Sequence, residues 1–277
     1  CFAAMSNAGI TWTNTLSSGG HFAEWTYVEP EDDVFVFHDE DIELARKYGI
    51  RILANINTSR SSMPKWVLHD QPGAEGEWIR HPMGYFDLAE WEEFVFALVQ
   101  HYRDYVKHWL VLDEPDAGTN RYSPEDYLKM LRAAQRAAKR ADPESVVLVH
   151  TGTDSSFRAT LLPLLEPGDF EVQYTYIGRF EREIGLQRGA EGHLLGKPLW
   201  TVEYGGVEKL STHLPEVSAE TCAPWAAVAD NVRHSLRWGV RGLSWGRAEK
   251  WFRYDARYPG PPPGVRYMSL WEHDGSL

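Results

Sequence analysis

The stretch His108–Asp116, HWLVLDEPD, decides the expected fold. Trp109 to Leu112 form a short apolar run that ends at two adjacent carboxylates and a proline. Such a run, bounded by turn residues, is typical of a strand covered on both faces in a parallel sheet. Pro115 has no N–H and favours extended backbone at the residue before it. We therefore expect Glu114 to lie at the end of this strand in an extended conformation.

A second stretch, Pro198–Gly206, PLWTVEYGG, follows the same pattern. Its apolar segment stops at Glu203, and Tyr204 and two glycines, which allow a sharp turn, come next. Two glutamates at the carboxyl ends of different strands are the arrangement that double-carboxylate chemistry on a barrel of parallel strands requires.

Short apolar segments alternate with helical patterns along the whole chain, which is typical of a parallel sheet. At 277 residues the chain matches one (β/α)8 TIM barrel, and we expect a single domain over 1–277. A closed barrel needs eight strands, and the residues before the first expected strand resemble a helix end. We therefore expect the first barrel strand to lie upstream of Cys1. The seven expected strands are 10–13, 50–55, 109–112, 146–149, 170–175, 199–202 and 242–245.

Local signals place several helices and one long loop. Asp87 with Glu90 resembles a capping box and opens one helix, and Ser123 followed by Pro124 opens another that runs to about residue 140. A third helix is expected over 38–48, closed by Gly49. The segment 57–86, rich in Pro, Gly, Trp and His, is expected to be a loop that forms part of a binding cleft, because loops of that length are usually functional.

The composition limits the class of partner. A net charge of −12 argues against nucleic acid and anionic membrane surfaces. No apolar run approaches the roughly 18 residues that a membrane span needs. Twelve Trp and 13 Tyr exceed an ordinary load and favour carbohydrate mildly, because flat sugar faces stack on aromatic rings. Two cysteines imply no disulfide framework.

The motifs in this order resemble a known family. A Glu-Pro after one strand, a Glu after a strand 89 residues later and the aromatic segment LSWG at 243–246 are similar to the retaining glycoside hydrolases of the large (β/α)8 clan. That clan includes β-xylosidase-, β-galactosidase- and cellulase-type enzymes. The resemblance extends from NAGITWTN to YMSLWEHDG. It implies that Glu114 is the acid/base, that Glu203 is the nucleophile, and that the partner is an oligosaccharide or glycoside.

The chemistry requires such a pair independently of the family. One carboxyl must be protonated so that it can give a proton to the leaving oxygen. The other must be ionised so that it can attack the anomeric carbon. A separation of about 5–5.5 Å allows direct attack and retention, whereas a wider one leaves room for water and gives inversion. A single Glu-Pro more often caps a strand or pairs with Arg, but both glutamates in this order favour the catalytic interpretation.

Two departures from the clan weaken the expected activity. Asp113 stands where the clan usually has an Asn that binds the sugar 2-hydroxyl, and its charge should favour the protonated form of Glu114. Asn14 stands where an Arg near the nucleophile is common. Activity is therefore expected to be slow or narrow. The alternative function is a catalytically weak or inactive barrel that binds carbohydrate without hydrolysing it.

Supporting residues are candidates for substrate binding. Tyr176 stands where the clan often has a Tyr that hydrogen-bonds the nucleophile, and packing is an equal alternative. Trp245 is a candidate platform beneath the sugar ring. Trp25 and Trp66 line the cleft or anchor buried loops. His150 follows a strand and could reach the site, although a lone His more often satisfies a local hydrogen bond.

No motif implies a metal or cofactor. The histidines show no HExxH or comparable ligand spacing, and no GxGxxG or Walker sequence is present. We therefore expect no cofactor and no catalytic metal. An unrelated metal-dependent hydrolase on a TIM barrel is the third and weakest alternative.

Overall fold

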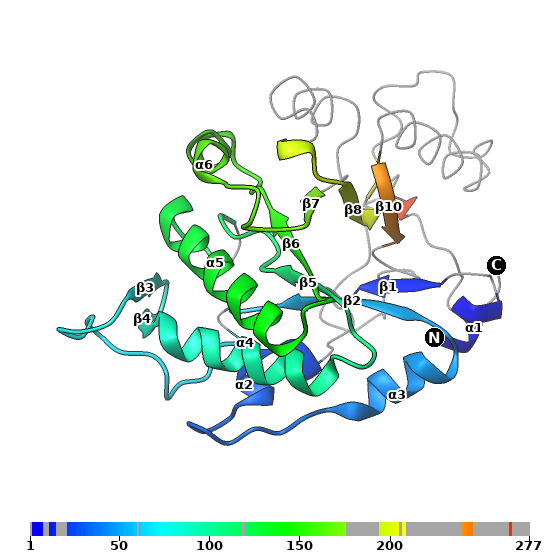
Figure 1. Cartoon of the computed structure of the whole chain (residues 1–277), viewed down its shortest axis with the longest axis horizontal. Coiled ribbons are helices and arrows are strands. Elements are labelled where there is room, and N and C mark those ends of the chain that lie inside the picture. The colour runs from blue at the N-terminus through cyan, green and yellow to red at the C-terminus, as the bar shows by residue number, and fades with distance from the viewer. Residues whose placement is uncertain are drawn as a thin grey trace.

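The fold is built around one parallel sheet (Figure 1). The computed structural model describes residues 2–7, 11–14, 21–59, 61–117, 120–175, 194–204, 207–208, 240–245 and 266–267. Within these ranges seven strands pair in the order β1-β2-β5-β6-β7-β8-β10, and every neighbouring pair is parallel. The seven expected strands are confirmed, with ends shifted by up to two residues. They are β1 (Trp12–Asn14), β2 (Arg51–Ile56), β5 (His108–Val111), β6 (Val146–His150), β7 (Val172–Thr175), β8 (Leu199–Tyr204) and β10 (Val240–Trp245).

Helices follow the first strands in alternation, as the βα pattern predicts. Two cap signals are confirmed: Asp87 accepts a hydrogen bond from the backbone N–H of Ala89, and Ser123 from that of Asp126. Gly49 follows its helix with a φ of 67°. The helical elements are α1 (Phe2–Asn7), η1 (His21–Ala23), α2 (Trp25–Val28), α3 (Asp39–Lys47), α4 (Leu88–Tyr102), α5 (Pro124–Ala141), α6 (Ser155–Leu161), η2 (Leu162–Leu164) and η3 (Leu194–Gly196).

The sheet is strongly curled. Trp12 of β1 and Trp200 of β8 lie five strand spacings apart in the sheet order, which would separate them by about 24 Å in a flat sheet. Their ring centroids are 5.3 Å apart, and the ring of His108 lies 4.8 Å from one and 4.9 Å from the other. Strands from both halves of the sheet therefore face each other across a common interior, as in a barrel. The described residues contain no eighth strand of this sheet.

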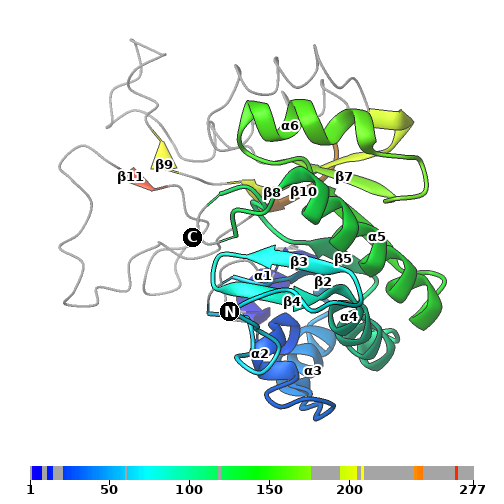
Figure 2. The same ribbon diagram turned by 90° about the vertical axis from the view of Figure 1, so that its left-hand side faces the viewer.

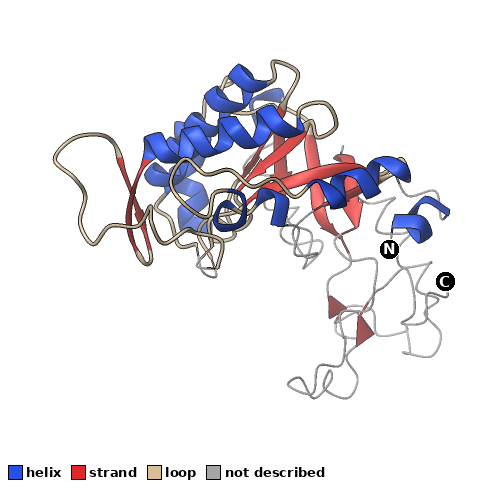
Figure 3. Cartoon of the chain, turned by 90° about the horizontal axis from the view of Figure 1, so that it is seen from below, coloured by secondary structure: helices blue, strands red, loops and turns tan. Residues whose placement is uncertain are grey.

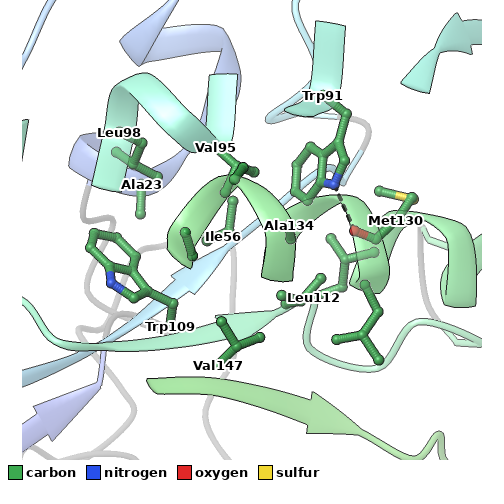
Figure 4. Close-up of a cluster of buried hydrophobic side chains, with 14 of the residues drawn as sticks. Ala23, Ile56, Trp91, Val95, Leu98, Trp109, Leu112, Met130, Ala134 and Val147 are labelled. Carbon is green, nitrogen blue, oxygen red and sulfur yellow. Dashed lines mark hydrogen bonds between the residues drawn. The ribbon is translucent and has the colours of Figure 1, made fainter. Parts of the chain in front are cut away.

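Apolar residues pack on both faces of the sheet. A small inner cluster comprises Leu53, Leu110, Leu148 and Val172. The larger outer cluster fills the space between the strands and helices α4 and α5, which lie side by side (Figure 2). Figure 4 shows this layer, in which the buried indole N–H of Trp91 on α4 donates to the carbonyl of Met130 on α5 at 3.0 Å. This double coverage explains why the strands have continuous apolar sequences.

The expectation that 57–86 is an irregular loop is wrong for its second half. Strands β3 (Trp78–His81) and β4 (Gly84–Asp87) form an antiparallel hairpin. Figure 3 shows that this hairpin projects away from the main sheet. Its strands are four residues long, too short for an alternating pattern to stand out. At the turn, Gly84 has a φ of 148°, a conformation that L residues rarely adopt.

Strands β9 (Val207–Glu208) and β11 (Arg266–Tyr267) form a separate antiparallel pair. None of the helices in the described part of the chain is both long and apolar enough to cross a membrane.

Candidate active site

Several of the expected site residues lie at the carboxyl edge of the sheet. Asn14, His150 and Trp245 are the last residues of their strands, Glu203 is the last but one of β8, and Glu114 follows β5 by three positions. Carboxyl ends of parallel strands meet at one edge, which is where barrel enzymes place their catalytic groups. For Glu203 and Trp245 the structure describes the backbone alone. Tyr176 lies outside the described residues.

The pairing of β8 with β10 is irregular beside Glu203. Thr201 pairs with Leu243, and Tyr204 pairs with Trp245, so β8 has one residue more than β10 in this interval. Glu203 lies within that interval. β-Bulges are frequent next to active sites, where they redirect side chains. Simple alternation along β8 therefore does not determine the face to which this position belongs.

The turn that carries Glu114 is strained, which corrects the expectation of an extended conformation. Glu114 has a φ of 45° and Leu112 a φ of 56°, both in the left-handed region. Each such conformation costs a non-glycine residue about 1–3 kcal/mol, and such residues cluster at active sites. Because the strand ends at Val111, the fully buried Leu112 turns outward into the layer beneath α4 and α5.

Hydrogen bonds within the loop hold this turn. The Nδ2 amide of Asn120 donates to the carbonyls of Asp113 at 2.8 Å and Glu114 at 3.3 Å. The Ala117 N–H donates to the Glu114 carbonyl at 3.1 Å, and the Tyr122 N–H donates to the next carbonyl along the chain at 2.8 Å. Each bond contributes about 0.5–1.5 kcal/mol net. Together they offset the strain of two left-handed residues.

A second brace ties this loop to the one after β6. The carboxylate of Asp116 accepts from the Thr153 N–H at 2.9 and 2.8 Å and from the Asp154 N–H at 2.5 Å. Gly152 makes the close approach possible: it has a φ of 88°, and a Cβ there would lie 2.4 Å from the Phe157 ring. The two loops therefore form one connected rim beside Glu114.

The buried ring of His150 lies next to the carboxyl of Asp113. Its Nδ1 accepts from the Gly152 N–H at 3.0 Å, so the ring proton is on Nε2, which lies 3.7 Å from Asp113 Oδ1. Burial, together with the charge of Arg158, lowers the pKa of His150 to about 3. At neutral pH this His is therefore uncharged, and it supports Asp113 as a neutral polar group.

Sequence reasoning missed Tyr127, which joins β5 to β6 at the same edge. Its fully buried hydroxyl accepts from the His150 N–H at 2.9 Å and donates to the Val111 carbonyl at 3.0 Å. Within α5 it matches the apolar stripe, so the sequence carries no signal for a bridging role. Asn120 was missed for a similar reason, because it stands in an irregular loop with many polar neighbours.

Other polar groups gather near β1 and β2. Asn14 is 4% exposed, and Asn55 on β2, which sequence reasoning also missed, is 6% exposed. The polar Asn55 within the apolar strand RILANI was the available signal. Glu24 pairs through its backbone with Asn57, just beyond the end of β2, and burial raises the pKa of this carboxyl while His21 opposes the shift.

The proposal that Trp25 lines the cleft is wrong. Trp25 is 0% exposed, stacks on Phe94 with centroids 5.1 Å apart, and donates its indole N–H to Glu29 Oε2 at 2.7 Å. Trp66 is half-buried, packs edge-on against Trp25 and donates to the Glu29 carbonyl at 3.0 Å. Trp25 is therefore a buried anchor, which was the alternative interpretation, whereas the half-buried Trp66 stays a candidate for the cleft.

Among the residues that the structure describes, no three His, Cys, Asp or Glu side chains form a group that could hold a metal ion. No protein-family model matches the chain, and no curated protein matches it by sequence.

Comparison with solved structures does find the fold. The chain is similar to a glucosidase from Croceicoccus marinus (19% identity, TM-score 0.62), over 99% of this chain and 60% of that one. It is similar to a family 39 glycoside hydrolase from Bacteroides cellulosilyticus (16%, TM-score 0.67; 99% and 57%) and to xylanase 10B from Thermotoga petrophila (16%, TM-score 0.63; 96% and 89%). The chain thus spans less than two thirds of the length of the first two of these proteins. It has the fold of the (β/α)8 glycoside hydrolases.

Proposed function

We propose that this protein is a retaining glycoside hydrolase with Glu114 as acid/base and Glu203 as nucleophile. The observation that carries the proposal is the position of both residues at the carboxyl edge of one curled parallel sheet, on strands three places apart. The shared fold with glycoside hydrolases supports it. Glycosidases need two carboxylates that flank the scissile bond.

The reaction follows from these two groups. The ionised carboxylate of Glu203 attacks the anomeric carbon and forms a glycosyl ester, while protonated Glu114 transfers its proton to the departing oxygen. Glu114, now ionised, takes a proton from water as that water attacks the same carbon. The ester bond to Glu203 breaks, the sugar leaves with its original anomeric configuration, and both carboxyls return to their starting states.

Other residues of the single domain, 1–277, complete the proposed site. Asp113 and Asn14 accept or donate hydrogen bonds to sugar hydroxyls, Tyr176 orients the nucleophile and Trp245 stacks beneath the ring. The substrates are β-linked neutral sugars, in keeping with the similar structures, which include a xylanase in complex with xylobiose, a glucosidase and an exo-β-1,4-mannosidase. No cofactor takes part.

The test compares variants on a panel of aryl β-glycosides. Glu203→Ala and Glu114→Ala should each lose at least about 100-fold in kcat on a substrate that the parent cleaves. Glu77→Ala, which removes an exposed carboxyl immediately before β3, should keep the kcat of the parent. The first product detected by NMR should be the β-anomer. Parent-like turnover by both site variants would end the assignment.

A second candidate is a barrel that binds oligosaccharide without hydrolysing it. Asp113 and Asn14, which depart from the usual pattern of the clan, favour this alternative. Calorimetry that detects oligosaccharide binding, with no product after long incubation, would support it over hydrolysis.

A further inference from the structure

A buried side chain of the loop after β5, that of Asn120, bonds to the backbone on both sides of Glu114. Asn120 is 6% exposed, and its amide nitrogen donates to the carbonyls of Asp113 at 2.8 Å and Glu114 at 3.3 Å. The same amide nitrogen therefore donates to two consecutive carbonyls. The opposite orientation of the amide would place Oδ1 against two carbonyl oxygens, so these contacts determine which way the amide points.

Those two carbonyls define the conformation of Glu114. They belong to the peptide groups on either side of its Cα, so their directions depend on its φ and ψ. The φ of 45° is one that Pro115 disfavours, because a residue before proline prefers extended backbone. Relaxation to the extended form would turn the carbonyls away from the amide and swing the Glu114 side chain to a new direction.

We propose that Asn120 is a positioning residue that holds the carboxyl of Glu114 in the direction from which it protonates the leaving oxygen. This inference rests on the proposed function, because it assigns Asn120 to the acid/base step. Asn120 acts through the backbone of Glu114 and needs no contact with the substrate.

The position of the acid predicts a leaving-group signature. A phenyl glycoside needs its departing oxygen protonated, whereas a 2,4-dinitrophenyl glycoside leaves as a stable anion and does not. Asn120→Ala should therefore lower kcat for the phenyl glycoside by about 100-fold, with little change in KM. The dinitrophenyl glycoside should form its glycosyl-enzyme at close to the parent rate, measured in the pre-steady-state burst.

A matched control separates positioning from a loss of stability. Asp142 is 5% exposed and braces a loop at the opposite, amino edge, where it accepts from Lys107 Nζ at 2.8 Å and the Glu144 N–H at 3.0 Å. Asp142→Ala should destabilise the protein to unfolding by urea, while both glycosides keep their parent rates. If Asn120→Ala does not fold, Asn120→Ser, which keeps a polar side chain of smaller size, undergoes the same comparison.

The outcomes distinguish the inference from the function beneath it. Glu114→Ala should show the leaving-group signature in full, and if it does not, the proposed function fails. If Glu114→Ala shows the signature but the Asn120 variants lose equally on both glycosides, or lose nothing, the positioning role is overturned while the function stands. A selective loss on the phenyl glycoside in the Asn120 variants, as in Glu114→Ala and not in Asp142→Ala, supports the inference.

Discussion

Glu29 is a carboxyl buried in the aromatic core. It is 2% exposed, and it accepts from the Trp25 indole at 2.7 Å and the Asp33 N–H at 3.3 Å. Burial raises its pKa to about 7, and the charges of Glu90 and Glu93 act in the same direction, whereas the two hydrogen bonds oppose the shift. We predict that Glu29→Gln alters the pH dependence of stability.

The sign and magnitude follow from linkage. In the unfolded chain this carboxyl has its ordinary pKa of 4.5. Between pH 4.5 and about 7 the folded state keeps the proton while the unfolded state loses it, so the contribution of Glu29 to stability falls as pH rises. Each pKa unit is worth about 1.4 kcal/mol, so the loss is about 3 kcal/mol by pH 7. Gln cannot ionise, so the variant avoids this loss.

Two histidines, the half-buried His108 and the buried His150, act in the opposite direction, so the parent curve alone is not informative. Burial lowers the pKa of His108 to about 4, helped by Arg51, and that of His150 to about 3. Between these pKa values and about pH 6.5, the unfolded state binds more protons than the folded state. The contribution of these histidines to stability therefore rises with pH. Because they are unchanged in Glu29→Gln, the difference between variant and parent isolates the carboxyl.

The assay is urea unfolding followed by tryptophan fluorescence at several values between pH 4.5 and 8. The free energy of unfolding of Glu29→Gln, minus that of the parent, should rise by about 3 kcal/mol across this range and then level off. Glu77→Gln, at an exposed carboxyl, should give a difference near zero throughout. A flat difference curve for Glu29→Gln would refute the reasoning.

Two further predictions concern the rim of the site. Tyr127→Phe removes the hydroxyl that bridges two buried backbone groups, the His150 N–H and the Val111 carbonyl, and should lower the free energy of unfolding by about 2–4 kcal/mol in urea. A loss under about 0.5 kcal/mol would show that the bridge contributes little. Gly152→Ala places a Cβ 2.4 Å from Phe157 at a φ of 88°, and should cost more than about 1 kcal/mol, or about 2–4 °C in Tm. An unchanged Tm in calorimetry would contradict the close contact.

Local patterns predicted the strands and helix starts because their causes are local. The apolar run at 146–149 and the Ser123-Pro124 cap each need only neighbouring residues to act. The carboxyl-edge positions of Asn14, Glu114 and His150 followed from those strands, since a residue just after a strand must lie at its end.

Contacts between distant segments were not predictable in this way. An indole serves equally well in a core and beneath a sugar, and Trp25 is buried because Phe94, 69 positions later, stacks on it. The hairpin β3–β4 was missed for a different reason: its pairing is local, but its strands are four residues long, too short for an alternating pattern to stand out.

The conformation of Glu114 shows where local rules fail at the site itself. Pro115 favours an extended residue before it, yet hydrogen bonds from Asn120, six positions downstream, support a left-handed one. The strand therefore places the carboxyl at the correct edge, while the loop determines its direction. Changes in such a loop can remove catalysis and leave the barrel intact. The two candidate functions share one fold and differ in whether the site turns over what it binds, which is why turnover and binding assays, and not stability, can separate them.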